Sequence, residues 1–309
     1  MMVMARLRDV PMVLQRVGAW TFVKNVYQKI NDDSLLTWAS ALAYSWLFAV
    51  FPFFLILMTL LPYLPDEWKT GATRQLEYAV AQLPQEAAST VWNNVSPKIN
   101  QLLYDPPRGL FSISVILTIW AASGGMNVTM SALDKCYEVQ KPRSFHKQRS
   151  LAILLTVIVA TLIVLVLVLL PIGTVVTHVT QKYLADRSLD KYLPLIYLWQ
   201  VLRYVLGLLL MFTVLACIYY FGPNFKHKWQ FLSPGAVFSI AVWIILGIGF
   251  RLYINKFGKY NETYGTIGGV AILLFCFYVD AVVLLVGAEI NSALDRGLGQ
   301  PAHLPEATT

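Results

Sequence analysis

Charged side chains are scarce in this sequence. Asp, Glu, Lys and Arg make up 13% of its 309 residues, against about 25% in an ordinary soluble domain. Five stretches contain none of the four: 34–65, 109–133, 150–181, 204–225 and 229–250. Each is long enough to cross about 30 Å of hydrocarbon as a helix. With 57% hydrophobic residues, the chain exceeds what one soluble core can bury, and we predict an all-α polytopic membrane protein.

The residues of soluble-enzyme chemistry are also few. The four histidines lie scattered, without HExxH or other metal-ligand spacing, and there is no Walker loop and no nucleophile elbow. Cys136, Cys217 and Cys276 are an odd number, and two lie in predicted spans, so no disulfide framework is implied. Charges interrupt every apolar run before Asp33, which argues against a signal peptide. We expect no enzyme, cofactor or bound metal.

The apolar stretches predict six transmembrane helices. We place them at roughly 36–61, 110–133, 151–177, 194–221, 235–256 and 265–291. The expected organisation is a cytoplasmic amphipathic segment at 1–35, a transmembrane domain at 36–291 and a cytoplasmic tail at 292–309. The first extracytoplasmic segment, 62–109, belongs to the transmembrane domain.

Basic residues set the predicted orientation. With the N-terminus inside, the inner segments hold thirteen Lys and Arg residues and the outer segments eight. The densest group is five in the short segment 134–150. Both termini are therefore predicted to lie in the cytoplasm. The net charge of +7 then points to membrane lipids, anionic ones included, as partners rather than nucleic acid. An oligomer remains open.

Amphipathic patterns mark both soluble-facing segments. Near the N-terminus, apolar residues recur at helical spacing opposite polar ones: Val13, Val17, Trp20 and Tyr27 against Arg16, Lys24 and Gln28. This predicts a helix lying on the inner membrane face, or one packed on the protein's own cytoplasmic loops. Two further helical stripes, 67–83 with Trp68 and 85–103 with Trp92, predict helices over the outer surface. They would be a lid on a cavity or a cap over helix ends.

Two charged residues lie well inside predicted spans, where charge costs about 2.5–3.5 kcal/mol on insertion scales. Asp280 lies near the middle of the sixth span and Arg203 in the fourth. The two differ in depth by about 9 Å at the helical rise, which an Arg side chain can largely bridge. They would form a structural ion pair or part of a substrate pathway. Glu289 lies near a membrane edge, where it is expected to snorkel.

Residues that loosen the backbone supply further pathway candidates. Gly124, Gly125 and Asn127 fall in the second span, and Tyr264 and Gly265 open the sixth. Such clusters either interrupt a helix to expose polar backbone to a substrate or permit close helix packing. Tyr44 and Ser45 in the first span complete the set of candidate lining residues.

Four segments carry a resemblance to a known family. They are ALAYSWLFAVFPFF at 41–54, LTIWAASGGMNVTMSALDKCYEV at 117–139, a stretch at 234–270 that includes NETYGTIGG, and a closing stretch at 277–294 that includes GAEIN. They resemble the bacterial YihY/BrkB membrane proteins, once mislabelled as ribonuclease BN. The likeness spans about residues 20–295. It implies six helices in the cytoplasmic membrane and links to serum resistance and to lipid or envelope transport.

The leading functional hypothesis is a membrane transporter or lipid translocase for an anionic amphiphile or small solute. It depends on Asp280 and Arg203, on an interrupted second span, on an outer lid, and on a basic inner loop that collects headgroups. The alternative is a non-transporting scaffold for envelope assembly, or a virulence-associated membrane protein without catalytic activity. In that case the polar residues would only hold helices together. An intramembrane enzyme ranks last, since no nucleophile–base set is evident.

Overall fold

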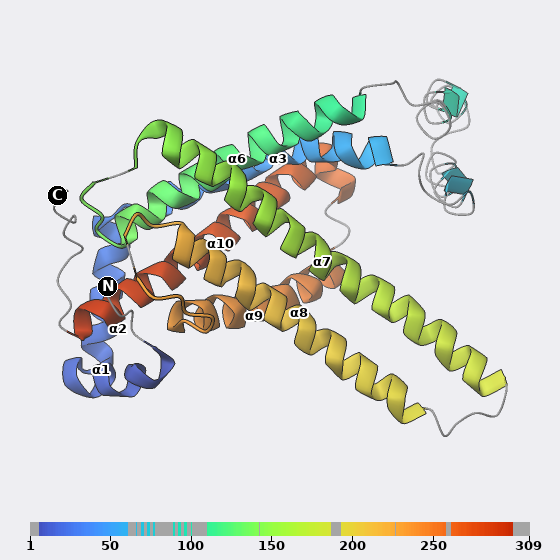
Figure 1. The fold of residues 1–309 in the computed structure, drawn as a ribbon. Helices are drawn as coiled ribbons and strands as arrows, with labels where there is room; N and C mark the ends of the chain where they lie inside the picture. The colour runs from blue at the N-terminus through green and yellow to red at the C-terminus, as the bar shows by residue number, and fades with distance from the viewer. Residues whose placement is uncertain are drawn as a thin grey trace. The chain divides into compact units, whose positions relative to one another are not determined.

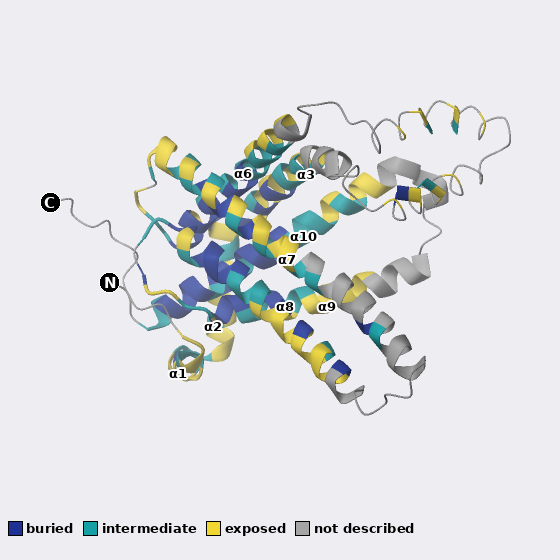
Figure 2. Ribbon diagram, turned by 45° about the vertical axis from the view of Figure 1, so that its right-hand side comes forward, coloured by how far each residue is buried: buried dark blue, intermediate teal, exposed yellow. Residues whose placement is uncertain are grey.

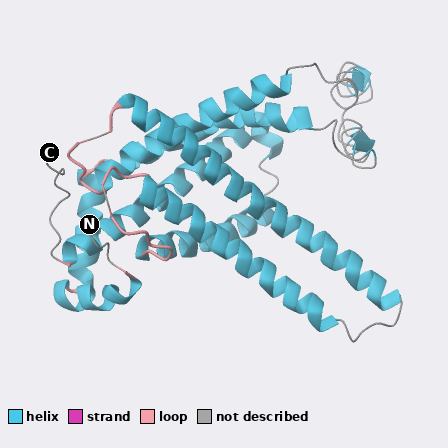
Figure 3. Ribbon diagram, in the orientation of Figure 1, coloured by secondary structure: helices cyan, strands magenta, loops and turns pink. Residues whose placement is uncertain are grey.

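The computed structural model describes residues 6–60, 110–141, 143–186, 193–225, 227–257 and 261–298, with isolated positions between 66 and 100. Every regular element in this part of the chain is helical (Figure 3). After a short 3₁₀ helix, Leu7–Asp9, come α1 (Val10–Val17), α2 (Ala19–Asp32), α3 (Leu35–Leu60), α6 (Leu110–Cys136), α7 (Phe145–Asp186), α8 (Leu193–Phe221), α9 (Pro234–Phe257) and α10 (Asn261–Gly297) (Figure 1).

All six predicted spans lie on long helices. By length and composition, four helical stretches can each cross a membrane, within α6, α7, α8 and α10. A fifth is possible if α2 and α3, bent by 60° at their junction, form one span. The apolar part of α9 within the described residues, Pro234–Phe250, is shorter. The chain is thus a multi-helix membrane protein, while the number six remains a prediction.

Two helices extend well beyond the predicted spans. α7 covers Phe145–Asp186 and α10 covers Asn261–Gly297, whereas the apolar runs predicted 151–177 and 265–291. Hydrophobicity locates only the part of a helix that suits lipid. The backbone hydrogen bonds continue into polar flanks, because each further residue adds one bond to a helix already formed.

The chain divides into two compact units. Unit 1 comprises residues 1–45 and 123–309, and unit 2 comprises residues 46–122. In unit 1, α7 packs along α8, and α10 packs on α9, α2 and α1. Unit 2 holds the later part of α3 and the first part of α6. Most of the predicted outer helices 67–83 and 85–103, Trp68 included, lies outside the described residues, so the choice between lid and cap stays a prediction.

Burial in unit 1 is uneven. Buried residues concentrate in the C-terminal half of α10 and in the ends of α6, α8 and α9 that contact it (Figure 2). On α8, by contrast, large apolar side chains such as Leu198 and Val201 are each 62% exposed. Exposed apolar side chains along long helices are what contact with lipid tails requires.

The N-terminal segment is two helices, not the single one its periodicity predicts. α1 ends at Gly18, whose φ of 85° has the sign that glycine adopts without steric cost. The turn lets Val13 of α1 pack against Gly297 and Leu294 of α10, where it is 1% exposed. Trp20 on α2 is 81% exposed. One side of the segment therefore packs on the protein, and an apolar ring on the other side stays uncovered.

Candidate functional site

The two intramembrane charges singled out in the sequence lie on different helices. Arg203 of α8 is 4% exposed, donates a hydrogen bond to the hydroxyl of Tyr204 at 3.1 Å, and places its guanidinium 4.8 Å from the centre of the same ring. Asp280 of α10 is half-buried. Burial of Arg203 agrees with an inward orientation. Its pairing with Asp280 stays a prediction.

The predicted interruption of the second span is wrong. α6 is one continuous helix through Gly124, Gly125 and Asn127. The Gly125 carbonyl accepts a hydrogen bond from the Thr129 hydroxyl at 2.9 Å, and that of Asn127 accepts one from Ser131 at 3.2 Å. In lipid a helix is the arrangement that satisfies the backbone internally, so two glycines do not suffice to break it. Apart from the backbone of its own helix, no atom of the described residues lies within 4 Å of a Cβ built on Gly124.

The remaining pathway candidates give a mixed result. Tyr264 and Gly265 lie on the continuous helix α10, and their side chains are outside the described set. Tyr44 is 59% exposed, and the Ser45 hydroxyl donates to the Ala41 carbonyl of its own helix at 2.9 Å. Whether any of these residues lines a pathway remains a prediction.

Glu289 does not snorkel, contrary to expectation. It is 0% exposed, deep in the last turns of α10. The sequence places it close to the end of an apolar run, but α2 and the end of α6 pack over that end and shut it off from water. A wholly buried carboxylate is costly unless it is paired. Its partners therefore define the candidate site.

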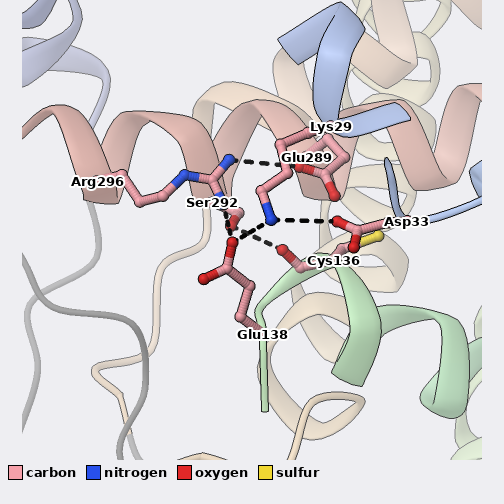
Figure 4. A network of polar contacts seen from close by, with 7 residues as sticks. All are labelled: Lys29, Asp33, Cys136, Glu138, Glu289, Ser292 and Arg296. Atoms are coloured by element: carbon pink, nitrogen blue, oxygen red, sulfur yellow. Dashed lines mark hydrogen bonds and ion pairs between the residues drawn. The ribbon is translucent and has the colours of Figure 1, made fainter. Parts of the chain in front are cut away.

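Those partners form a charge cluster of five residues, Lys29, Asp33, Glu138, Glu289 and Arg296 (Figure 4). Lys29 pairs with Glu138, and also with Asp33 at 3.6 Å. Arg296 contacts Glu138 at 3.0 Å and Glu289 at 3.6 Å. The cluster joins α2, the segment after α6 and the end of α10, which are far apart in the sequence.

Local structure explains how α10 presents its part of the cluster. Glu289, Ser292 and Arg296 follow each other at three- and four-residue spacing, so they share one face of the helix. The Ser292 hydroxyl donates to the Cys136 carbonyl at 2.8 Å. That carbonyl lies in the last turn of α6, where it has no partner within the helix. This hydrogen bond fixes the end of α6 against the face that carries Glu289.

Glu138 reaches the cluster through an unusual backbone. α6 ends with hydrogen bonds from Glu138 N to Lys135 O and from Val139 N to Asp134 O, the Schellman pattern. The position that glycine normally fills in this pattern is Glu138, with φ of 55°. Burial alone would raise the pKa of Glu138, but the hydrogen bond and charge of Lys29 and the charge of Arg296 together lower it below its ordinary value. Glu138 is thus held as a carboxylate between two cations.

A second polar region joins α8, α9 and α10 deeper in unit 1. The Tyr219 hydroxyl donates to the Leu284 carbonyl at 2.8 Å and lies 3.1 Å from the Ser239 hydroxyl. Asn291 accepts a hydrogen bond from Gly235 N at 2.7 Å. The backbones of α9 and α10 meet here, because a Cβ on Gly235 would collide with the carbonyl group of Gly287.

The basic loop after α6 is partly committed to structure. Arg143 donates to the carbonyls of Phe221, Gly222 and Pro223 at 3.2, 2.6 and 2.8 Å. These groups end α8 and need partners from outside the helix. The sequence led us to expect that the whole basic loop collects headgroups. Arg143 is not available for this, because it is bonded to the end of α8. Exposed positive charge on the loop remains at Lys135, Lys141 and Lys147.

These contacts bring four segments together at one end of unit 1. They are the N-terminal helices, the segment after α6, the segment after α8 and the end of α10. All four were predicted to share one side of the membrane, and their proximity agrees with that arrangement. Which side it is stays a prediction.

Sequence reasoning missed most of the charge cluster. Lys29, Asp33, Glu138 and Arg296 look like ordinary charges flanking apolar runs. One signal was available, since Lys29 and Asp33 lie four residues apart, as do Ser292 and Arg296. Neither pattern says that α2 packs on α10. Within the described part of the chain, no three His, Cys, Asp or Glu side chains are placed to hold a metal ion.

Comparisons with known proteins agree with the helical membrane architecture. A family model described as virulence factor BrkB matches residues 26–308. The ribonuclease-like protein YfkH of Bacillus subtilis (strain 168) is 28% identical over 285 residues, which cover 92% of this chain and 99% of that protein. A UPF0761 membrane protein of Stenotrophomonas maltophilia (strain R551-3) is 24% identical over 97% of this chain. A second, from Xanthomonas campestris pv. campestris (strain B100), is 23% identical over 96% of it. The chain spans 66% and 64% of the length of these last two proteins. No solved structure matches.

Proposed function

The chain belongs to the virulence factor BrkB family of membrane proteins, and we propose that it is a transporter that moves an anionic amphiphile or a small solute. The observation that carries this proposal is Glu289, an ionisable residue with 0% exposure on a helix able to span the membrane. Ionisable groups in such positions are rare and usually belong to a substrate or ion pathway.

Stability alone is a weak reason for a cluster of this kind. Burying charges costs several kcal/mol per ion, and apolar residues of similar volume often stabilise a protein as well or better. The ion pairs here cross between α2, the segment after α6 and α10. Pairs between separate elements can break and re-form as those elements move, which is how many switching proteins exchange two arrangements. We therefore assign the charge cluster the role of a gate at one end of unit 1.

The exposed charges near this gate favour an anionic substrate. Lys135 in the last turn of α6 and Lys141 and Lys147 after it are exposed, and Lys24 is exposed on α2. Lysines beside a membrane attract anionic headgroups by roughly 1 kcal/mol each. If the predicted orientation holds, they would gather such headgroups on the cytoplasmic side of the inner membrane.

The proposed orientation can be tested by labelling single cysteines in intact cells, in a background lacking the three native ones. Asn93→Cys should react with a membrane-impermeant maleimide and Phe145→Cys should not. Phe145 is 76% exposed, so its failure to react would report the membrane barrier rather than burial. Labelling of Phe145→Cys from outside would reverse the assignment.

We do not extend the ribonuclease-like name of the Bacillus relative to this chain. A metal-dependent nuclease needs several convergent metal ligands, and the described residues provide no such group.

A non-transporting scaffold is the second candidate, and the crossing of α8, α9 and α10 favours it. There Tyr219, Ser239 and Asn291 form hydrogen bonds with neighbouring helices. Polar residues of this kind hold membrane helices together without any substrate. In a scaffold, the charge cluster would do the same.

Lipid movement in proteoliposomes separates the two candidates. Protein would be reconstituted into phosphatidylcholine vesicles with a trace of phosphatidylglycerol carrying a fluorophore on its headgroup, and translocation followed by adding a membrane-impermeant quencher. We expect faster quenching of the inner-leaflet probe than in protein-free vesicles, and loss of this effect in Glu289→Gln.

The matched control is Asp32→Asn. Asp32 is exposed and is the last residue of α2, directly before Asp33, so its removal changes the charge of α2 without touching the cluster. A fluorescent phosphatidylcholine probe tests the preference for anions. Quenching equal to that of protein-free vesicles, with protein that melts cooperatively, would reject translocation of these lipids and favour the scaffold.

A further inference from the structure

The charge cluster carries more negative than positive charge. Its acids are Asp33, Glu138 and Glu289, and its bases are Lys29 and Arg296. With every group ionised, the cluster would hold one uncompensated negative charge. Glu289 is 0% exposed and Asp33 is 6% exposed. An uncompensated charge at such a place is strongly disfavoured, because the surroundings cannot solvate it.

The bonding pattern locates the excess. Glu138 takes the nearest contact of both cations, at 3.0 Å in the case of Arg296. Asp33 and Glu289 receive only the longer contacts, each of 3.6 Å. Neither carboxyl oxygen of Glu289 has a hydrogen-bond partner among the described residues, and neither has Oδ2 of Asp33. Buried acceptors of this kind are rare in proteins and call for an explanation.

The carboxyl groups of Asp33 and Glu289 are close enough to repel each other when both are ionised. Glu289 interacts electrostatically with Asp33 as well as with Arg296 and Lys29. Two carboxylates that share one site cannot both ionise freely, and one of them keeps its proton.

We infer that Asp33 and Glu289 form a proton-binding site that holds one proton between two carboxyl groups. The proton forms an O–H bond with one oxygen, which donates a hydrogen bond to the other carboxylate. This makes the cluster neutral and provides a donor for acceptors that otherwise lack one. In a proton-driven transporter this site would couple proton movement to transport. That role rests on the function proposed above, whereas proton binding itself does not.

The other groups around the pair do not replace this proton. From α2, Lys29 is shared with Glu138, and from α10, Arg296 is shared in the same way. The Ser292 hydroxyl is used by the Cys136 carbonyl. The buried Cys136 thiol is a weak hydrogen-bond partner of Glu289, and because it is neutral it leaves the excess negative charge in place. Among the described residues, Lys29 and Arg296 are the cations that form ion pairs with these two carboxyl groups.

Infrared spectroscopy of the purified full chain in lipid tests the site directly. A protonated carboxyl group gives a C=O stretching band apart from the carboxylate bands, and the band shifts in D₂O. We expect wild-type protein at neutral pH to show such a band, and Asp32→Asn to keep it. Glu289→Gln should lose it.

Glu138→Gln provides the sharper comparison. It removes one negative charge without altering either proton-sharing residue, and it frees Arg296 to neutralise Glu289. The band should then weaken at the same pH. A wild-type spectrum without the band would overturn the inference, as would a band that persists undiminished in Glu289→Gln. The wild-type measurement does not depend on any variant folding.

Transport is a separate arm of the same test. If wild-type protein moves the phosphatidylglycerol probe, an imposed pH gradient should change the initial rate, and Glu289→Gln should abolish the response. Movement that ignores the gradient would reject coupling while leaving the infrared result to decide proton binding. Absence of movement together with the band would reject translocation of this lipid and not the proton site.

Discussion

The crossing of α9 and α10 offers a sharp test of packing, at Gly235. A Cβ added there would overlap the Gly287 carbonyl oxygen and lie 2.7 Å from its carbonyl carbon and 2.8 Å from the Asn291 amide nitrogen. The first two atoms are helix backbone, which cannot rotate away as a side chain does. Gly235→Ala must therefore push the two helices apart.

The size of the effect follows from two losses. Overpacking at a tight contact costs about 1–3 kcal/mol. Separation of the helices also stretches the hydrogen bond from Gly235 N to Asn291 Oδ1, now 2.7 Å long, which contributes roughly 1 kcal/mol. We expect Gly235→Ala to lower the free energy of unfolding by about 2–4 kcal/mol.

Gly247 is the matched control on the same helix. Within the described part of the chain, nothing lies within 4 Å of a Cβ placed there. Gly247→Ala should be neutral or stabilise the protein by up to about 1 kcal/mol, because alanine favours the helix. Equilibrium unfolding in mixed detergent micelles measures both variants. Equal stability of the two would refute the close approach of α9 and α10.

Three further predictions concern named polar contacts. Arg143→Lys should lower the free energy of unfolding by about 1–2 kcal/mol, since one ammonium group cannot reproduce the three carbonyl contacts of the guanidinium. Unchanged stability of Arg143→Lys would show that these contacts do not hold the end of α8. Tyr219→Phe should cost about 1–2 kcal/mol, because the carbonyl of Leu284 loses its buried donor; a neutral result in the same unfolding assay would count against that bond. The pKa of Glu138 is lower in the folded protein than in the unfolded chain. Its ionised carboxylate therefore stabilises the fold at a pH above the pKa of the unfolded chain, and this contribution is lost as the pH falls through the pKa of the folded protein. Melting curves from neutral to acid pH should thus converge for wild type and Glu138→Gln, and curves that stay parallel would contradict the ion pairs.

The helical architecture could largely be predicted from the sequence, and the physical reason is the bilayer. Lipid forces apolar runs into helices, so the scarcity of charge between 34 and 65 or between 204 and 225 is enough to place α3 and α8. The ends of α7 and α10 could not be predicted from hydrophobicity. Beyond the apolar runs these helices continue through polar residues, where backbone hydrogen bonds maintain the helix without a hydrophobic pattern in the sequence. The family was also recognisable from its motifs.

The candidate site was mostly beyond prediction. Glu289 was noticed but expected to reach water, since its burial depends on α2 folding back over α10 through a 60° bend. That bend involves Ser34 at φ of 52°, and serine gives no warning of a left-handed turn. Glu138 occupies a similar conformation without glycine. Sequence patterns report local conformational preference, whereas this site depends on Ser34 and Glu138, whose backbone conformations go against that preference.

That contradiction supplies a last prediction, which asks whether Glu138 serves stability or function. A non-glycine residue in the left-handed region costs about 1–2 kcal/mol, and glycine is the residue that this helix end favours. Partly exposed ion pairs return only about 0.2–1 kcal/mol, and Glu138 makes its pairs with its side chain 29% exposed. On balance Glu138→Gly should be at least as stable as wild type, and more stable than Glu138→Gln by about 1 kcal/mol, since glutamine keeps the backbone strain without the charge. If the gate assignment is right, Glu138→Gly should nevertheless lose the movement of the phosphatidylglycerol probe. A glycine variant less stable than the glutamine variant would show that the carboxylate is there to hold the helices together, and the scaffold would then be the better account of the charge cluster.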